Sequence, residues 1–156
     1  MKSFLFVFVM IFALSAQHEG LTDAILSDQN VTPNNYPWTP MTHGHAIDQT
    51  HSGTLVVGWF GGSEENHDDL WIWVTRKEPG KEWETPYSPT GQGNTGQPCI
   101  FQSSDPDAPL LLYENCWKAN PSRMRFSTDE GTSWSDAIDT PLRTTSKNRP
   151  LEIKGG

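Results

Sequence analysis

Apolar residues in this chain occur in short runs separated by turn residues, and no stretch keeps the period of an amphipathic helix. The clearest run alternates, with Leu70, Ile72 and Val74 on one side and Trp71 and Trp73 on the other. Because side chains alternate across a strand, this pattern predicts a β-strand with two different faces. Further strands are predicted at residues 54–60, 99–102, 110–113 and 124–127. The chain is therefore expected to be all-β.

A repeat with a constant offset of 51 residues relates segment 76–83 to segment 127–134. The offset aligns Glu78 with Asp129, and it likewise aligns two glycines and two tryptophans. A period of this size with a few short strands per unit is typical of β-propeller blades. We expect blade one at about residues 42–86, blade two at about residues 96–141, and the start of a third blade at residues 147–156.

The second copy of the repeat contains Ser127, Asp129, Gly131 and Trp134, in the pattern Ser-x-Asp-x-Gly-x-x-Trp. Its local chemistry predicts a turn: Asp129 can bond backbone N–H groups two residues ahead, Gly131 permits a positive φ, and Trp134 covers the turn. The pattern is identified as the Asp box of sialidase-like β-propellers, where it joins the third and fourth strands of a blade. The motif is structural, so it predicts the fold and not the reaction.

Other motifs extend the resemblance. Residues 53–65 are similar to the first-blade signature G-x-L-x-A-W-F-G-G-T-x-E-G of one branch of the family, and residues 69–73 are similar to its D-V-A-I-W continuation. Across residues 42–156 the chain resembles the N-terminal part of the BNR-repeat, sialidase-like glycosyl hydrolases. The resemblance implies a fragment of a six-bladed propeller, with two blades and the start of a third. Open blade edges of such a fragment can support self-association.

The N-terminal segment reads as a secretory signal peptide over residues 1–16. Lys2 precedes an uninterrupted apolar run, and Ala13 and Ser15 form a small-x-small cleavage pattern. The alternative is an uncleaved anchor, although the run is shorter than the roughly 20 residues that span a bilayer. Residues 17–41 are expected to form an extended arm that carries a glycosylation sequon at Asn30. These features predict a secreted protein.

The balance of charge excludes some partners. The chain has 19 acidic and 11 basic residues and a formal net charge of −8. An acidic protein is poorly suited to nucleic acid or to an anionic membrane surface. We therefore expect a glycan as the partner, with no nucleic acid, no membrane after signal cleavage, and no cofactor.

The only two cysteines, Cys99 and Cys116, each lie in an apolar run, with a turn-like segment between them. Paired strands would bring them close, and exported proteins keep disulfides, so a bridge is one expectation. The alternative is a pair of buried thiols.

The resemblance places the general acid of the family in the loop at residues 61–69. Asp69 aligns best and Asp68 is next to it, while Glu64 is a further carboxylate for contacting the sugar. Glycoside hydrolysis needs a carboxylic acid with a raised pKa, and neighbouring carboxylates can raise one. The alternative is a solvated acidic loop.

The first arginine of the sialidase carboxylate-binding triad would align with His43. A neutral imidazole cannot form the bidentate fork of an arginine, so the substrate is expected to differ from sialic acid. The family's tyrosine nucleophile and later arginines would come from blades beyond Gly156. The expected substrate-binding residues lie on inner strands: His43, His45, Gln97, Lys147 and Asn148. We expect no metal, because the histidine spacing is generic.

The predicted function is a secreted, sialidase-like glycoside hydrolase that acts on terminal sugars. A carbohydrate-binding fragment without activity is one alternative, since exposed tryptophans such as Trp71 and Trp117 can stack on sugars. A polysaccharide lyase is another, with His43 or His45 as base and Lys147 neutralising a carboxylate. An inactive remnant is the third.

Overall fold

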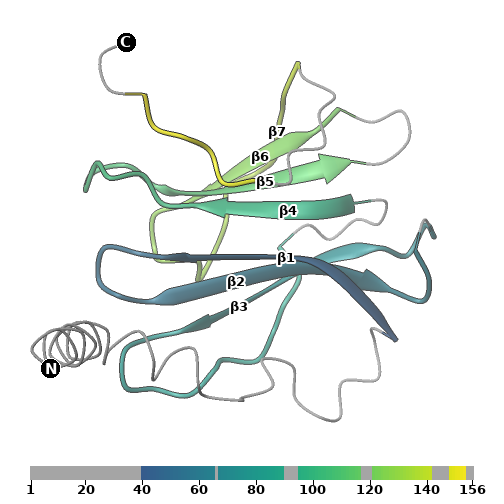
Figure 1. Ribbon diagram of the computed structural model, residues 1–156, viewed down its shortest axis with the longest axis horizontal. Coiled ribbons are helices and arrows are strands. Elements are labelled where there is room, and N and C mark those ends of the chain that lie inside the picture. The colour runs from purple at the N-terminus through teal and green to yellow at the C-terminus, as the bar shows by residue number, and fades with distance from the viewer. Residues whose placement is uncertain (1–39, 66, 90–94, 117–120, 142–147, 154–156) are drawn as a thin grey trace, which may run out of the picture. The chain divides into compact units, whose positions relative to one another are not determined.

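Seven antiparallel strands form two sheets among the residues that the computed structural model describes (Figure 1). The structure describes residues 40–65, 67–89, 95–116, 121–141 and 148–153. The first sheet has the order β1 (Met41–Gln49), β2 (Leu55–Gly62) and β3 (Trp71–Lys77). The second has the order β4 (Thr95–Phe101), β5 (Leu110–Cys116), β6 (Arg123–Ser127) and β7 (Ile138–Asp139).

The all-β prediction is confirmed: the described residues contain no helix, and the five strands predicted within the two blades each overlap an observed one. Because none of these residues is helical, they include no apolar helix that could cross a membrane. The alternation predicted for β3 is present too. Leu70, Ile72 and Val74 are almost fully buried, whereas Trp71 is 37% exposed.

Among the described residues, a hydrophobic core fills the space between the two sheets. Val56, Ile72 and Val74 come from the first sheet and pack with a matching set from the second, Ile100, Leu110 and Leu112. Each such side chain contributes roughly 1.5–3 kcal/mol on burial. A methyl group added at Gly58 would lie 2.9 Å from Ile100 Cδ1, so this glycine lets β2 approach β4 closely. The two sheets are therefore packed face to face, as adjacent blades are.

The offset of 51 residues reappears in the backbone of the two turns. In the first blade, Lys81 N–H donates to Glu78 O at 3.0 Å; in the second, Thr132 N–H donates to Asp129 O at 3.1 Å. Gly80 and Gly131, also 51 positions apart, both have a positive φ, of 73° and 81°. The two segments therefore form equivalent turns even though the first lacks the full Asp-box sequence.

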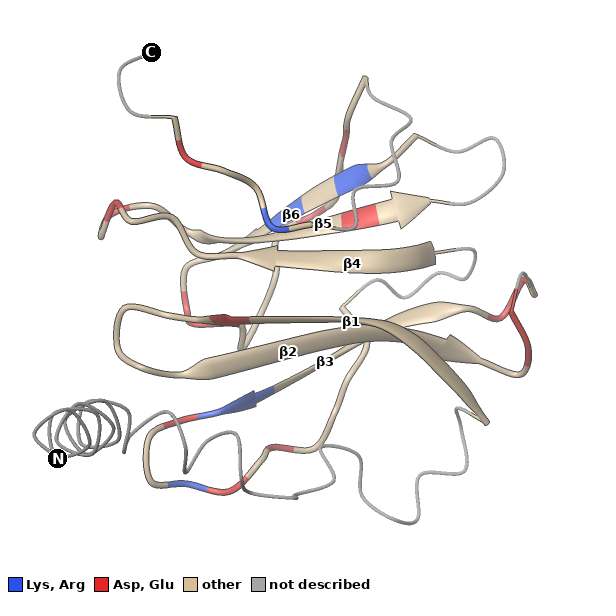
Figure 2. Ribbon diagram, in the orientation of Figure 1, with Lys and Arg blue, Asp and Glu red and all other residues tan. Residues whose placement is uncertain are grey.

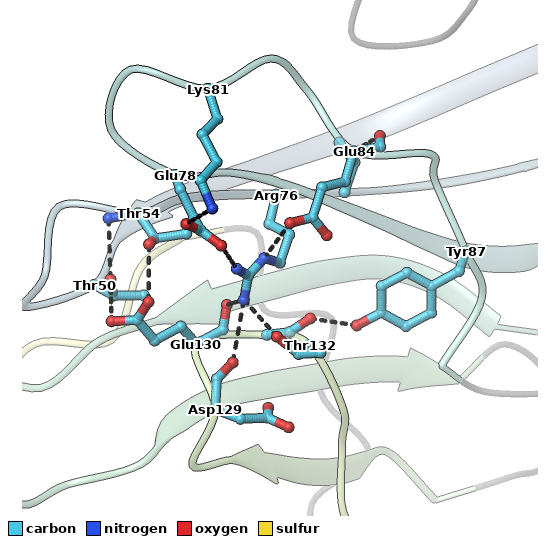
Figure 3. Close-up of polar contacts among 12 residues, drawn as sticks. Thr50, Thr54, Arg76, Glu78, Lys81, Glu84, Tyr87, Asp129, Glu130 and Thr132 are labelled. Atoms are coloured by element: carbon cyan, nitrogen blue, oxygen red, sulfur yellow. Dashed lines mark hydrogen bonds and ion pairs between the residues drawn. The ribbon is translucent and has the colours of Figure 1, made fainter.

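One arginine joins the two turns (Figure 3). The side chain of Arg76, which is 8% exposed, pairs within its own blade with Glu84 at 2.9 Å and with Glu78. Its Nη1 donates across the blade boundary to the carbonyl oxygens of Asp129 at 3.2 Å and Glu130 at 3.3 Å. Thus the residue that replaces the Asp-box serine in the first blade binds the Asp box of the second.

Residues 148–153 were expected to be the first strand of a third blade, and the structure shows no strand there. They nevertheless run beside β4: the Arg149 guanidinium lies 5.3 Å from the Phe101 ring centre, and Glu152 accepts a hydrogen bond from Ser104 N–H at 2.8 Å. A strand is defined by backbone pairing, and the contacts found here involve side chains. The segment therefore occupies the place of an inner strand without forming a ladder.

Candidate functional site

The acidic turn at residues 63–69 lies at the end of the first sheet where β1 begins, as the pairing of Met41 with Gly62 shows. Thr95, the first residue of β4, donates to Leu70 O from its backbone N–H at 3.3 Å and from its hydroxyl at 3.2 Å. The beginnings of β1 and β4 and the β2–β3 turn thus share one end of the molecule, on the right in Figure 1.

This turn carries carboxylates without a neighbouring lysine or arginine in its own sequence, and Figure 2 shows it as an acidic site beyond the ends of β2 and β3. Its carboxylate residues are exposed: Glu64, Glu65, Asp68 and Asp69. A ligand that approaches this end of the sheets can therefore reach them directly.

Asp69 is held by several hydrogen bonds within the turn. It accepts the Ser63 backbone N–H at 3.1 Å and the Ser63 hydroxyl at 3.1 Å, and His67 Nδ1 lies 3.1 Å from its Oδ1. A Cβ added at Gly62 would lie 2.7 Å from Asp69 O and 2.9 Å from Asp69 Oδ1. The second glycine of the Gly-Gly pair therefore leaves the room in which this residue sits.

The electrostatics of Asp69 oppose the role expected for it. Desolvation acts to raise the pKa of its carboxyl, but the hydrogen bonds from Ser63 and His67 outweigh it, and the pKa is lowered. A general acid that works near neutral pH needs a raised pKa. In this structure Asp69 is thus a stabilised carboxylate that orients its neighbours.

The two predicted histidines of β1, His43 and His45, are both exposed. A β-bulge interrupts the ladder between His43 and Ala46, where Gly44 has a φ of 63°. The His43 ring lies 5.9 Å from the ring of Phe60, centre to centre. The bulge therefore bends β1 locally next to these two histidines.

The structure brings Gln97 to the β1 bulge. A Cβ added at Gly44 would lie 2.9 Å from Gln97 Cγ, so the two inner strands are in contact here. β4 has its own irregularity between Thr95 and Pro98, and the Gln97 carbonyl accepts a hydrogen bond from Asn115 Nδ2 at 2.7 Å. Both inner strands are therefore bulged at the same end of the sheets, next to each other.

The remaining predicted residues are spread more widely. Asn148 is exposed, and its carbonyl lies 3.6 Å from the sulfur of Cys99. Lys147 and Asn30 lie outside the described residues. Among the residues that the structure describes, no group of three or more histidine, cysteine or acidic side chains could hold a metal ion.

The predicted Cys99–Cys116 disulfide is not formed, and both cysteines are free. In the β4–β5 ladder Cys99 lies opposite Tyr113, while Cys116 lies opposite Thr95. The cysteines are thus offset by three positions along β5, about 10 Å at roughly 3.3 Å per residue, whereas bridged Cα atoms lie within about 7 Å. Burial raises the pKa of both thiols.

The Asp box forms a closed turn, although its bonds differ in detail from the prediction. Asp129 Oδ1 accepts the N–H of Ser133, four residues ahead, at 2.9 Å. The Gly131 N–H instead donates to Ser127 Oγ at 2.8 Å. Trp134 covers the turn by packing on the core, and its Nε1 donates to the Tyr87 hydroxyl at 2.8 Å. Burial raises the pKa of Tyr87 to about 12, so its hydroxyl remains a donor, and it donates to Gly131 O.

A cavity of about 220 Å³ lies between the blades at the Asp-box end. It is lined by Ser127 and Glu130 of the Asp box together with residues of two other turns, among them His51, Gln102 and Asp107. None of the predicted catalytic or substrate-binding residues lines it. The cavity is therefore separate from the acidic turn at the opposite end of the sheets.

Two residues of the turn gained a role that sequence reasoning did not assign. Ser63 supplies two hydrogen bonds to Asp69, and His67 supplies a third contact. Only the spacing hinted at this, since His67 and Asp69 are two positions apart in a predicted turn, where side chains can converge. The geometry of the folded turn was needed to show which side chains meet.

Two face-to-face antiparallel sheets, each with an Asp-box-type turn after its third strand, define the chain as part of a sialidase-like β-propeller. The sequence model of the BNR repeat-like domain family matches residues 53–156, and the chain belongs to this family. A crystal structure of a protein of unknown function from Dyadobacter fermentans is similar, with a TM-score of 0.53 and 16% sequence identity. The match covers 69% of this chain and 38% of that one, and it shows the fold alone. No curated protein matches the chain.

Proposed function

We propose that this chain is part of a secreted, sialidase-like glycoside hydrolase that acts on the terminal sugars of a glycan. The observation that carries the proposal is that an acidic turn and the beginnings of two strands meet at one end of the sheets. There, the acidic turn at residues 63–69 adjoins the bulged, polar beginnings of β1 and β4. Secretion is part of the proposal and depends on the predicted signal peptide at residues 1–16.

The inner strands supply the sugar contacts in this proposal. His43, His45 and Gln97 lie at the beginnings of β1 and β4, and Asn148 lies in the segment beside β4. Imidazole and amide groups donate and accept hydrogen bonds with sugar hydroxyls. Because no arginine stands at the His43 position, a terminal sugar without a carboxylate is the favoured substrate.

The acidic turn supplies the proton in this proposal. Asp69 and Asp68 are the two carboxyl groups predicted for it, and the hydrogen bonds that keep Asp69 ionised favour a supporting role for that residue. A proton donor matters most when the leaving group is a poor one. Its loss should therefore slow the cleavage of alkyl glycosides far more than that of nitrophenyl glycosides.

The test is a panel of nitrophenyl and methyl glycosides of different terminal sugars, incubated with the purified full-length protein that contains this chain. We expect wild type to hydrolyse at least one member of the panel. In the Asp68→Asn or Asp69→Asn variant, the rate of hydrolysis of the methyl glycoside should fall by about 10²–10⁴-fold. Asp136→Asn, which changes an exposed carboxylate outside the turn, is the matched control. Absence of turnover across the panel in the wild-type protein would refute the proposal.

A carbohydrate-binding function is the second candidate, and one observation favours it. Trp71 follows the acidic turn, is 37% exposed, and stacks on Trp73 with ring centres 6.3 Å apart and an interplanar angle of 20°. An exposed, supported indole is a suitable platform for a sugar ring. Saturable glycan binding without turnover, lost in Trp71→Ala, would establish this function in place of hydrolysis.

A further inference from the structure

We infer that His67 is the proton-transfer residue of the acidic turn and that Asp69 is the residue that positions it. This inference rests on the proposed function, because it assigns roles within the same site. It starts from a short contact in which His67 Nδ1 lies 3.1 Å from Asp69 Oδ1. A histidine held in this way through one nitrogen has its other nitrogen left for a ligand.

The carboxylate that holds the ring is itself fixed from several sides. Ser63 donates to Asp69 from its backbone N–H and from its hydroxyl, each at 3.1 Å, and Gly62 provides the space for the carboxylate. These bonds favour the ionised form of Asp69, which can only accept hydrogen bonds. The proton between the two side chains therefore belongs to Nδ1, which makes Nε2 the proton-accepting nitrogen of the neutral ring.

The dyad is open to a ligand, since the side chain of His67 is 59% exposed and that of Asp69 is 49% exposed. The other titratable groups of the turn are all acidic: Glu64, Glu65 and Asp68. The nearest inner strand adds two exposed imidazoles, those of His43 and His45. A substrate that reaches this turn therefore meets the His67 ring beside exposed carboxylates and imidazoles.

In the proposed reaction the His67 ring acts first as the acid and then as the base. The protonated ring gives its Nε2 proton to the glycosidic oxygen as the bond from that oxygen to the anomeric carbon breaks, and the bonding electron pair stays on the leaving oxygen. A water molecule then bonds to the anomeric carbon and gives a proton to Nε2, which restores the imidazolium. Asp69 keeps its charge throughout and stabilises the imidazolium through Nδ1–H, as the aspartate of a serine protease triad does.

The first test needs no substrate. In the full chain labelled with ¹⁵N-histidine, long-range ¹H–¹⁵N spectra should show neutral His67 as the Nδ1–H tautomer, with the signals assigned by their loss in His67→Gln. Asp69→Asn should reverse the tautomer, because the asparagine amide can donate to Nδ1. If wild-type His67 has the Nε2–H tautomer that free imidazole prefers, the inference fails. The same holds if a folded Asp69→Asn variant keeps the wild-type tautomer.

The second test separates this inference from the proposed function. If wild type hydrolyses a glycoside, His67→Gln should lower turnover of the methyl glycoside by about 10²–10⁴-fold and spare the nitrophenyl glycoside. Asp69→Glu should recover part of the activity lost in Asp69→Asn, since it restores a charged acceptor. Wild-type turnover of the methyl glycoside in His67→Gln would overturn the inference while leaving the hydrolase proposal intact. If wild type hydrolyses nothing, the hydrolase proposal fails, and the tautomer alone decides whether Asp69 positions His67.

Discussion

Arg76 Nη1 lies 2.5 Å from Thr132 Oγ1, and this contact crosses the boundary between the two blades. Arg76 occupies the place of the Asp-box serine in blade one, whereas Thr132 belongs to the intact Asp box of blade two. In blade two the Asp-box serine accepts the Gly131 N–H, whereas the arginine at its place in blade one is a buried cation that binds the neighbouring blade (Figure 3).

Replacing this cation should weaken the packing of the blades. Arg76→Ala removes every bond of the guanidinium and leaves Glu78 and Glu84 without their common partner. We expect a loss of about 2–4 kcal/mol in the free energy of unfolding, measured by urea denaturation. Lys81→Ala, at a side chain 66% exposed, is the control and should change stability by less than about 1 kcal/mol. Equal effects of the two variants would contradict the structural role given to Arg76.

Gly62→Ala should disturb the acidic turn directly. The new methyl group would meet the backbone oxygen of Asp69 at 2.7 Å, so the turn must shift. We expect a loss of about 1–3 kcal/mol in the free energy of unfolding. In addition, the amide signals of Ser63 and Asp69 should move in NMR spectra. Gly80→Asn is the control, because space there is open and asparagine tolerates its positive φ. Unchanged amide signals in Gly62→Ala would show that the turn has more room than the structure indicates.

Acid should destabilise the junction between the blades. Hydrogen bonds from Ser52, Thr54 and Thr50 lower the pKa of Glu130 against the effect of desolvation. For Asp129, desolvation acts to raise the pKa, but hydrogen bonds from Ser133 and Ser127 outweigh it, and the pKa is lowered.

Because both folded-state pKa values lie below the unfolded values, the stability they contribute is present above about pH 4.5. It is lost as the pH falls through the folded values. Thermal unfolding followed between pH 7 and pH 3 should show a falling Tm below about pH 4.5, with a shallower fall in Asp129→Asn. The same dependence of Tm on pH in both proteins would show that Asp129 does not contribute to the loss of stability in acid.

The two cysteines should remain thiols in the purified protein. Burial raises the pKa of each thiol, which reduces the thiolate that reacts. We expect the native protein to react slowly with a disulfide reagent and the urea-unfolded protein to release two equivalents quickly, without prior reduction. Release of thiol only after a reducing agent would show a disulfide and would require a shift in the β4–β5 register.

Local features were well determined by the sequence alone. The turn at Asp129 and Gly131 depends on neighbouring residues, and the alternation of Leu70, Ile72 and Val74 depends on the period of a strand. The offset of 51 residues likewise predicted two equivalent units, and the turns at Gly80 and Gly131 share their backbone conformation. Such features could be predicted because the interactions that form them span only a few residues.

Other features were decided only by the tertiary structure. Strand register separated Cys99 from Cys116, and a bulge interrupted the β1 ladder between His43 and Ala46. The pairing of Arg76 with a turn more than 50 residues away depended on the packing of two sheets. Register, bulges and sheet packing are set by the sum of many weak contacts between distant segments, and no short pattern of residues records that sum.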